Sequence, residues 1–384
     1  MARFSAIALL LALAMLLGAC GGGLNFGTPP PPPPPPPSSP AFVYISNTSA
    51  STLTGINVAG GKPSQLVTSL PPPGAAPIGM VATGKLLYIA NSGSGTISGF
   101  SFNADTGALQ TLPGSPAAAA PGVRQLALCP GNGGPTPPRF LYAASDSAVL
   151  GYNITGTGQL TPVPGSPFSA GAQPAAVLTD SACNFLFVAS KGSNSISVFS
   201  VNLSSGLLTS VPGSPFPAGA APVALAIGDG FLFAANSASN NVSVYRISSG
   251  AGTGTFLTQV PVSPFSAGFS PSALVYRSPT LYVANSGSGD VSAFTTALDT
   301  GRLTPVVGSP FLAGTQPTAM IAFSPPVSNG AQQSFLYVAN AGSNNLSGFT
   351  FAAGGALTVV QGFPFPAGTN PQGLVFACGH CGYP

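Results

Sequence analysis

The sequence comprises 384 residues, only 4% of which are charged, and its formal net charge at pH 7 is +3. It contains no Lys/Arg cluster, which argues against nucleic acid as a partner. Its 50 glycines and 43 prolines are a feature of many disordered chains, but 45% of the residues are hydrophobic, so the chain is able to bury a core.

The first predicted element is an export signal. Arg3 precedes an apolar run over residues 6–17, which is too short to cross a membrane as a helix. Leu17-Gly18-Ala19-Cys20 resembles the lipobox of bacterial lipoproteins, which implies acylation of the Cys20 thiol. We therefore expect a lipoprotein signal peptide over residues 1–19, and the glycine after Cys20 resembles a signal for outer-membrane sorting. The alternative is an ordinary cleaved signal that precedes a chance cysteine.

Residues 20–40 are predicted to form a lipid-anchored, Gly/Pro-rich stalk. Nine consecutive prolines, Pro29–Pro37, permit only extended polyproline II, which rises about 3.1 Å per residue. The prolines and the residues just after them predict a stiff spacer of roughly 35 Å.

The remaining region, residues 41–384, carries one phrase that recurs seven times. Successive copies are roughly 44 to 55 residues apart, which is the period of a propeller blade and too long for leucine-rich repeats. The copies are Phe42–Asn47, Leu87–Asn91, Leu141–Ser145, Leu186–Ser190, Leu232–Asn236, Leu281–Asn285 and Leu336–Asn340.

Each period carries signals for four strands, A to D. In one example, apolar or alternating runs lie at residues 272–276, 281–284, 291–294 and 303–306, with Gly, Ser, Asn or Pro between them. We interpret Asn285, at the B–C tip, as a turn residue. A Gly-Ser-Pro-Phe motif recurs between the periods and is predicted to end strand D and to place its Phe between adjacent blades.

The two ends of this region complement each other. The chain enters at strand B of its first blade and ends with a lone strand A, Pro371–Ala377. Pairing these strands closes the ring and leaves no exposed sheet edge between them. The sequence therefore predicts an all-β, seven-bladed β-propeller of four-stranded antiparallel blades, and we expect a monomer.

A family resemblance supports this fold. The repeated Tyr-Val-Ala-Asn, followed by Val-Ser-Val or a variant of it, resembles the YVTN-repeat propellers, which are similar to the seven-bladed lactonase-like superfamily. The resemblance covers about residues 42–377. The absence of Trp argues against WD40 and quinoprotein-dehydrogenase blades, and no sialidase Asp-box occurs.

The fold predicts where a ligand would bind. Strands alternate in direction, so the D–A and B–C connections share one face, which we call the upper face. Pro40 leads the tether into the opposite, lower face. By analogy of fold, we expect any site on the upper face, where the A strands begin and the central channel opens.

The resemblance implies catalytic residues that are mostly missing here. Lactonase-like propellers tend to carry Pro-Arg-His where strand A begins. The Arg position holds Ile78, Arg124, Ala175, Val223, Ser272, Thr318 and Gln372, and the His position holds Gly79, Gln125, Ala176, Ala224, Ala273, Ala319 and Gly373. Lactone opening needs a base that titrates near neutrality or a metal-activated water. With no Glu, scattered Asp and a single His380 near the C-terminus, we predict no catalytic set.

Polar residues at these positions predict a binding site instead. Arg124, Gln125, Ser272, Thr318 and Gln372 are expected to form a hydrogen-bonding rim for a neutral or anionic ligand such as a glycan. The alternative is that they only solvate the channel mouth.

The cysteines predict two disulfides in an oxidising compartment. Cys129 and Cys183 lie in or beside A–B connections of adjacent blades, so we predict that they pair and that Cys378 pairs with Cys381. The Cys378–Cys381 segment resembles the active site of protein disulfide isomerases. However, no helix follows to lower a thiol pKa, and a lone CxxC supplies too few zinc ligands.

Three functions remain open. The first is a non-catalytic binding or scaffold module on a lipoprotein of the cell envelope, with a glycan or an envelope protein as partner. The second is a lactonase-like hydrolase, of the 6-phosphogluconolactonase type, with a degenerate active site, and the third is a structural spacer. We expect no metal, cofactor or nucleic acid, and we expect the outer membrane as location.

Overall fold

The computed structural model describes residues 40–59, 63–66, 70–129, 139–248, 256–326 and 333–378, which belong to one compact unit. The predicted signal peptide and most of the predicted stalk, with Cys20, lie outside the described residues.

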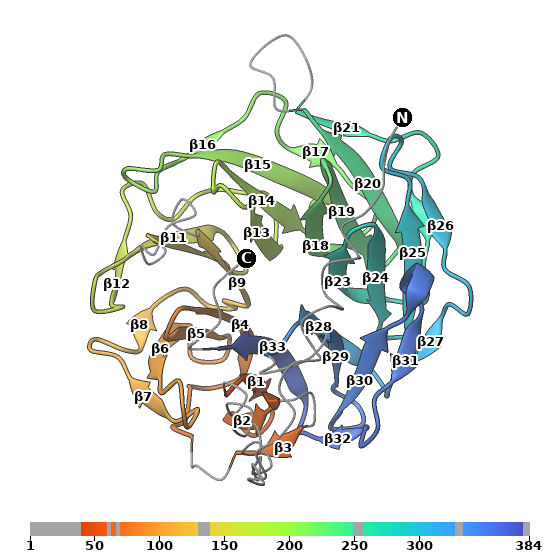
Figure 1. Ribbon diagram of the computed structural model, residues 1–384. Coiled ribbons are helices and arrows are strands. Elements are labelled where there is room, and N and C mark those ends of the chain that lie inside the picture. Colours follow the sequence, from red (N-terminus) through yellow and green to blue (C-terminus); the bar gives the residue numbers. More distant parts are fainter. Residues whose placement is uncertain are drawn as a thin grey trace, which may run out of the picture. The chain divides into compact units, whose positions relative to one another are not determined.

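The described strands form seven antiparallel sheets, which are the predicted blades (Figure 1). Blade 1 consists of β1 (Phe42–Asn47), β2 (Thr52–Asn57), β3 (Ser64–Gln65) and β33 (Pro371–Ala377). Blade 2 consists of β4 (Pro77–Thr83), β5 (Leu86–Asn91), β6 (Thr96–Phe102), β7 (Leu109–Thr111) and β8 (Ala117–Ala118). Blade 3 consists of β9 (Gln125–Cys129), β10 (Phe140–Ala144), β11 (Val149–Ile154) and β12 (Leu160–Pro162).

The other four blades repeat this order. Blade 4 consists of β13 (Pro174–Thr179), β14 (Phe185–Ser190), β15 (Ser195–Val201), β16 (Leu208–Ser210) and β17 (Phe216–Pro217). Blade 5 consists of β18 (Pro222–Gly228), β19 (Phe231–Asn236), β20 (Asn241–Ile247), β21 (Leu257–Gln259) and β22 (Phe265–Ser266). Blade 6 consists of β23 (Pro271–Arg277), β24 (Thr280–Asn285), β25 (Asp290–Thr296), β26 (Leu303–Pro305) and β27 (Phe311–Leu312). Blade 7 consists of β28 (Pro317–Phe323), β29 (Phe335–Asn340), β30 (Asn345–Phe351), the short 3₁₀ helix η2 (Ala353–Gly355), β31 (Leu357–Val359) and β32 (Phe365–Pro366).

The ring closes as predicted. β33 pairs antiparallel with β1, from Phe42 opposite Ala377 to Ser46 opposite Gly373, so the C-terminal strand becomes strand A of blade 1. The seven innermost strands, β33, β4, β9, β13, β18, β23 and β28, contact one another in a complete circuit. The seven-bladed propeller with this closure is therefore confirmed.

The core lies between blades. Each of the seven clusters of buried hydrophobic residues combines side chains from two neighbouring blades. In four blades, a buried Tyr of strand B also donates its hydroxyl to a carbonyl in the C–D turn of the next blade, as Tyr44 does to Gly107 at 2.7 Å. Gly107 has a φ of 70°, and a Cβ there would meet the Phe42 ring at 2.8 Å. No blade is thus a self-sufficient unit.

The Gly-Ser-Pro-Phe motif does not end strand D as predicted. In blade 4, β16 and β17 both pair with β15, and the motif forms a loop between them. In this loop the Ser214 hydroxyl accepts the Val198 N–H of β15 at 2.9 Å, in place of the backbone carbonyl that a continuous strand would supply. Pairing with β15 then continues at β17. Phe216 is buried against Leu232 of blade 5, between adjacent blades as expected.

The interpretation of the asparagine that ends strand B as a turn residue is wrong. Asn285 is fully buried, and its Nδ2 donates to the Asp290 Oδ1 at 2.7 Å and to the Ser292 Oγ at 2.9 Å. Asn47, Asn91, Asn236 and Asn340 make equivalent bonds to strand C. The positive φ angles occur nearer strand C, for example at Gly289 with a φ of 71°. The buried carboxamide therefore fastens strand B to strand C.

Candidate functional site: the central channel

The central channel is a cavity of about 340 Å³ that all seven A strands line. Among the described residues, its polar side chains are those of Gln125, Thr179, Ser272, Thr318 and Gln372, and none of its lining side chains is ionisable. Four of the five residues predicted for the rim are therefore brought together here. What they offer to a ligand depends on the bonds they already make.

Ser272 and Thr318 are used to join blades. The Ser272 hydroxyl donates in a bifurcated bond to the Pro317 carbonyl at 2.7 Å and to the Ala284 carbonyl at 3.2 Å. Thr318 repeats this arrangement one blade further on, with Pro371 at 2.8 Å and Ala339 at 3.2 Å. With their protons committed, these two hydroxyls retain only acceptor capacity toward a ligand.

The two glutamines keep more of their hydrogen-bonding capacity. Gln372 donates its Nε2 to the Asn370 Oδ1 at 2.7 Å, which orients its amide. The Gln125 side chain is exposed and has no hydrogen-bond partner among the described residues. The strands that carry them, β33 and β9, flank β4, where a Cβ on Gly79 would overlap the carbonyl oxygen of Arg124. Backbones approach closely here, and the two amides are the freest polar groups of the channel.

Arg124 does not line the cavity with the other four. Its guanidinium pairs with the Asp146 carboxylate in the B–C connection of the same blade, and its Nε donates to the Gly122 carbonyl at 3.0 Å. The Arg124 side chain is 25% exposed and that of Asp146 is 55% exposed, so this ion pair lies at the solvent-facing side of blade 3.

Comparison with known proteins agrees with this architecture. A family model described as a seven-bladed β-propeller lactonase matches residues 146–267, which span blades 4 and 5 and part of blade 3. This chain is a seven-bladed β-propeller that is similar to the lactonase family. No curated protein matches the sequence.

Solved structures of lactonase-like propellers cover the described unit almost completely. A candidate 6-phosphogluconolactonase from Bacteroides fragilis is 19% identical with a TM-score of 0.70, and covers 88% of this chain and 98% of its own. One from Bacteroides uniformis is 17% identical with a TM-score of 0.70, over 88% of this chain and all of its own. The periplasmic gluconolactonase of Pseudomonas aeruginosa is 18% identical with a TM-score of 0.66, over 88% and 99%. At this level of identity the likeness shows the fold.

The propeller also has a ring of residues with strained backbones on its upper face, which the sequence did not predict. The residue before the first proline of strand A has a positive φ of 50° to 57° in six blades, although none is glycine: Ala76, Gln173, Ala221, Ser270, Gln316 and Asn370. Their carbonyls accept a backbone N–H from the B–C tip of the same blade. Four of their N–H groups donate to the B–C tip of the preceding blade, as Ser270 N does to the Asn240 Oδ1 at 2.8 Å. The available signal was a glycine three residues before each of these prolines, which packs on the buried Asn or Ser of strand B.

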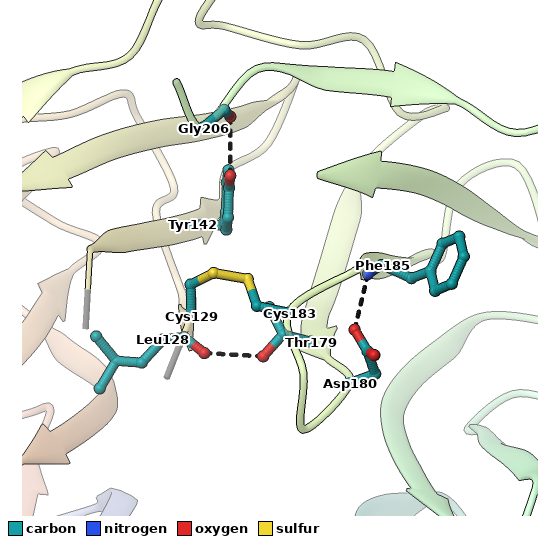
Figure 2. Close-up of a disulfide and its surroundings, with 8 residues drawn as sticks. All are labelled: Leu128, Cys129, Tyr142, Thr179, Asp180, Cys183, Phe185 and Gly206. Atoms are coloured by element: carbon teal, nitrogen blue, oxygen red, sulfur yellow. Dashed lines mark hydrogen bonds between the residues drawn. A yellow bond between two sulfur atoms is a disulfide. The ribbon is translucent and has the colours of Figure 1, made fainter. Parts of the chain in front are cut away.

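A disulfide joins blades 3 and 4 at the lower face (Figure 2). Cys129 ends β9 and Cys183 lies in the A–B connection of blade 4, and their Cα atoms are 5.2 Å apart. Thr179, also missed by sequence reasoning, donates its hydroxyl to the Leu128 carbonyl at 2.8 Å beside this bond. Cys378 is disulfide-bonded too, but its predicted partner Cys381 lies outside the described residues, as does His380.

A hydrogen-bonded group of Asp229, Tyr276 and Ser278, which we call the Asp229 cluster, lies at the lower face between blades 5 and 6. Asp229 accepts hydrogen bonds from the Ser278 hydroxyl at 2.6 Å and the Tyr276 hydroxyl at 2.7 Å, and these bonds hold the pKa of Asp229 below its usual value. Burial, with a smaller effect of Asp229, raises the pKa of Tyr276 to about 12. Both groups keep their ordinary charge states at neutral pH.

Two features are absent from the described residues. They contain no group of three or more His, Cys, Asp or Glu side chains placed to hold a metal ion. None of their helices is long and apolar enough to cross a membrane.

Proposed function

We propose that this lactonase-like propeller is a non-catalytic binding module whose channel holds an uncharged, hydroxyl-rich ligand. The observation that carries the proposal is the channel lining, which presents amides, hydroxyls and backbone groups. Amides donate and accept hydrogen bonds but do not take up a proton near neutral pH, so they suit recognition better than general base catalysis. The amides of Gln125 and Gln372 would form the principal contacts.

The test measures binding and hydrolysis on the same protein. Isothermal titration with gluconic acid δ-lactone and neutral monosaccharides should detect binding, and removing both amides by Gln125→Ala and Gln372→Ala should weaken it at least tenfold. Gln173→Ala is the matched control, because this exposed glutamine does not line the cavity. Lactone hydrolysis faster than the spontaneous rate would contradict a non-catalytic role.

A second candidate function is lactone hydrolysis. It is favoured by the match to the lactonase family model and by structural neighbours described as 6-phosphogluconolactonases. The Arg124–Asp146 pair is then the charged group from which activity would be sought. If the wild-type chain opens 6-phosphogluconolactone, Arg124→Ala should abolish the activity. If the wild type does not, this candidate is excluded for that substrate.

We further propose a cell-envelope location, in the outer membrane, with a lipid on Cys20. The support is the lipobox-like sequence and the periplasmic location in the name of the Pseudomonas aeruginosa neighbour. Labelling of cells with a radioactive fatty acid should mark the wild-type protein and leave Cys20→Ser unlabelled. A labelled Cys20→Ser protein would refute lipidation at this residue.

A further inference from the structure

The seam between blades 6 and 7 departs from the repeat. In blades 2 to 6 the serine of the Gly-Ser-Pro-Phe motif, or of its variant, accepts a backbone N–H from the middle of strand C at 2.8 to 3.0 Å. The donor and acceptor pairs are Gly99 and Ser115, Gly151 and Ser166, Val198 and Ser214, Val244 and Ser263, and Ala293 and Ser309. In blade 7 this position is Phe363, which has no side-chain acceptor.

The phenylalanine changes the shape of the seam. Its ring packs on Tyr337 with 4.8 Å between centroids, and it occupies the space above Gly348, where a Cβ would meet the ring at 2.5 Å. The Gly348 N–H corresponds to the N–H groups that donate to serine in blades 2 to 6, and Phe363 offers it no side-chain acceptor. Gly348 and Phe363 both border an open groove.

This groove has a volume of about 570 Å³, within the range of roughly 300–1,000 Å³ usual for ligand pockets. It runs between β27 of blade 6 and β31 of blade 7, which are neighbours in Figure 1. Leu312 and Val359 on its border are 82% and 63% exposed. Phe269, which is 68% exposed, contacts the groove residue Gly287 through its backbone. Exposed apolar side chains that border a groove can mark a binding site.

The polar part of the groove carries no charge. Its described lining residues include seven with hydroxyl or amide side chains and none that is ionisable. The Thr315 hydroxyl and the Gln316 amide have no hydrogen-bond partner among the described residues, so both are available to a ligand. The backbone of strand C is less available, because Val360 N already donates to the Gly348 carbonyl at 2.9 Å. This combination disfavours an added peptide strand, which needs free backbone groups along an edge.

We propose that the groove between blades 6 and 7 binds an uncharged oligosaccharide chain. Sugar rings present apolar C–H faces and neutral hydroxyl edges, and the groove matches them with Leu312 and Val359 on one hand and Thr315 and Gln316 on the other. This site is separate from the channel and does not depend on the function proposed for it.

The test uses the full-length chain and an array of neutral and acidic hexasaccharides, followed by titration with cellohexaose, maltohexaose and chitohexaose. At least one neutral hexasaccharide should bind, and the double substitution Leu312→Asp and Val359→Asp should weaken it at least tenfold. Both residues are exposed, so the variant should keep the wild-type melting temperature. Val307→Asp is the matched control, since Val307 is 93% exposed on blade 6 but does not border the groove.

Three outcomes would overturn the proposal. The first is that no neutral member of the array binds, and the second is that acidic members bind better than neutral ones. The third is that Gln125→Ala with Gln372→Ala abolishes binding while the groove variant retains it, which would assign the oligosaccharide to the channel. Conversely, loss in the groove variant alone would support this site even if the channel binds nothing.

Discussion

The upper and lower faces of the propeller are built on different principles. On the upper face the same contacts recur, because the buried Asn of strand B and the strained residue before strand A occupy equivalent places in most blades. On the lower face each seam is distinct. Blades 3 and 4 share a disulfide, blades 5 and 6 share the Asp229 cluster, and blades 7 and 1 stack Phe323 on Phe376 at 4.8 Å.

Charge follows the same division. The structure describes thirteen charged residues, and nine of them lie in or beside the A–B and C–D connections of the lower face: Lys85, Asp105, Arg139, Asp180, Asp229, Arg246, Arg277, Asp299 and Arg302. The upper face is therefore the more uniform and the more neutral of the two. The repeat maintains a neutral face around the channel, while the lower face is free to carry individual contacts between blades.

The largest effect should come from breaking the closure that both faces share. Deleting residues 371–384 removes β33 and exposes the edge of β1 along six paired positions. We expect loss of the cooperative thermal transition and aggregation, measured by calorimetry and light scattering. Deleting only residues 382–384 is the control and should leave the transition in place. A folded monomer lacking β33 would show that the ring does not need to close.

The disulfide tests one seam of the lower face alone. Replacing Cys129 and Cys183 by alanine releases a link between residues 54 positions apart, which on a chain-entropy estimate costs about 4 kcal/mol of unfolding free energy. Urea denaturation would measure the loss. An unchanged midpoint would mean that the hydrogen bond of Thr179 and the packing around it suffice at this seam.

The buried asparagines test the repeated contacts of the upper face. Asn236→Ala leaves the Asn241 Oδ1 and the Ser243 hydroxyl without their donor, and we expect a loss of about 2 kcal/mol. Asn236→Ser should cost less, because blades 3 and 4 already carry Ser145 and Ser190 at this position. Chemical denaturation of Asn91→Ala and Asn340→Ala should give similar losses, and widely different values would contradict the equivalence of the blades.

Features of the fold and of the candidate site could be predicted from the sequence where they recur in several blades. Blade number, strand order and closure follow from a period repeated seven times, and the neighbouring positions of Cys129 and Cys183 follow from the blade order. The role of Asn285 was missed because asparagine is also a common turn residue, and burial decides between the two roles. The departure of Arg124 from the channel depends on Asp146, which lies in another connection and leaves no pattern in strand A.

The blade 6–7 groove shows the same limit. The sequence shows that Phe363 replaces the serine of the other blades, but it does not show whether the phenylalanine ring fills the space between the blades or leaves a groove. Only the packing of its ring on Tyr337 and over Gly348 shows that the substitution leaves a groove. A single departure from a repeat can therefore be located in the sequence, but its effect on the surface is seen only in the structure.

A smaller effect should come from Val262, where blade 5 departs from the other blades. It has a φ of 65° at the position that glycine occupies in the equivalent loops, for example Gly308 with a φ of 86°. A β-branched residue is disfavoured there, so Val262→Gly should raise the unfolding free energy by about 1 kcal/mol. Gly308→Val should lower it by a similar amount, as measured by urea denaturation. Destabilisation by Val262→Gly would show that the exposed valine makes a contact worth more than its strain.

The smallest effect should be a local change of charge at the lower face. Tyr276→Phe removes one of the two hydroxyls that hold the pKa of Asp229 below its usual value, so that pKa should rise, although Ser278 remains. Because the folded pKa is lowered, the stabilisation from this carboxylate is present above the unfolded pKa of about 3.9 and is lost as the pH falls through the folded pKa. The difference in stability between wild type and variant should therefore shrink on acidification below about pH 4.

Carbon NMR titration of the Asp229 carboxyl would measure the pKa. Tyr245→Phe is the control, because the Tyr245 hydroxyl donates to the Pro217 carbonyl. An equal rise in both variants would mean that the Tyr276 hydroxyl does not act on Asp229 directly.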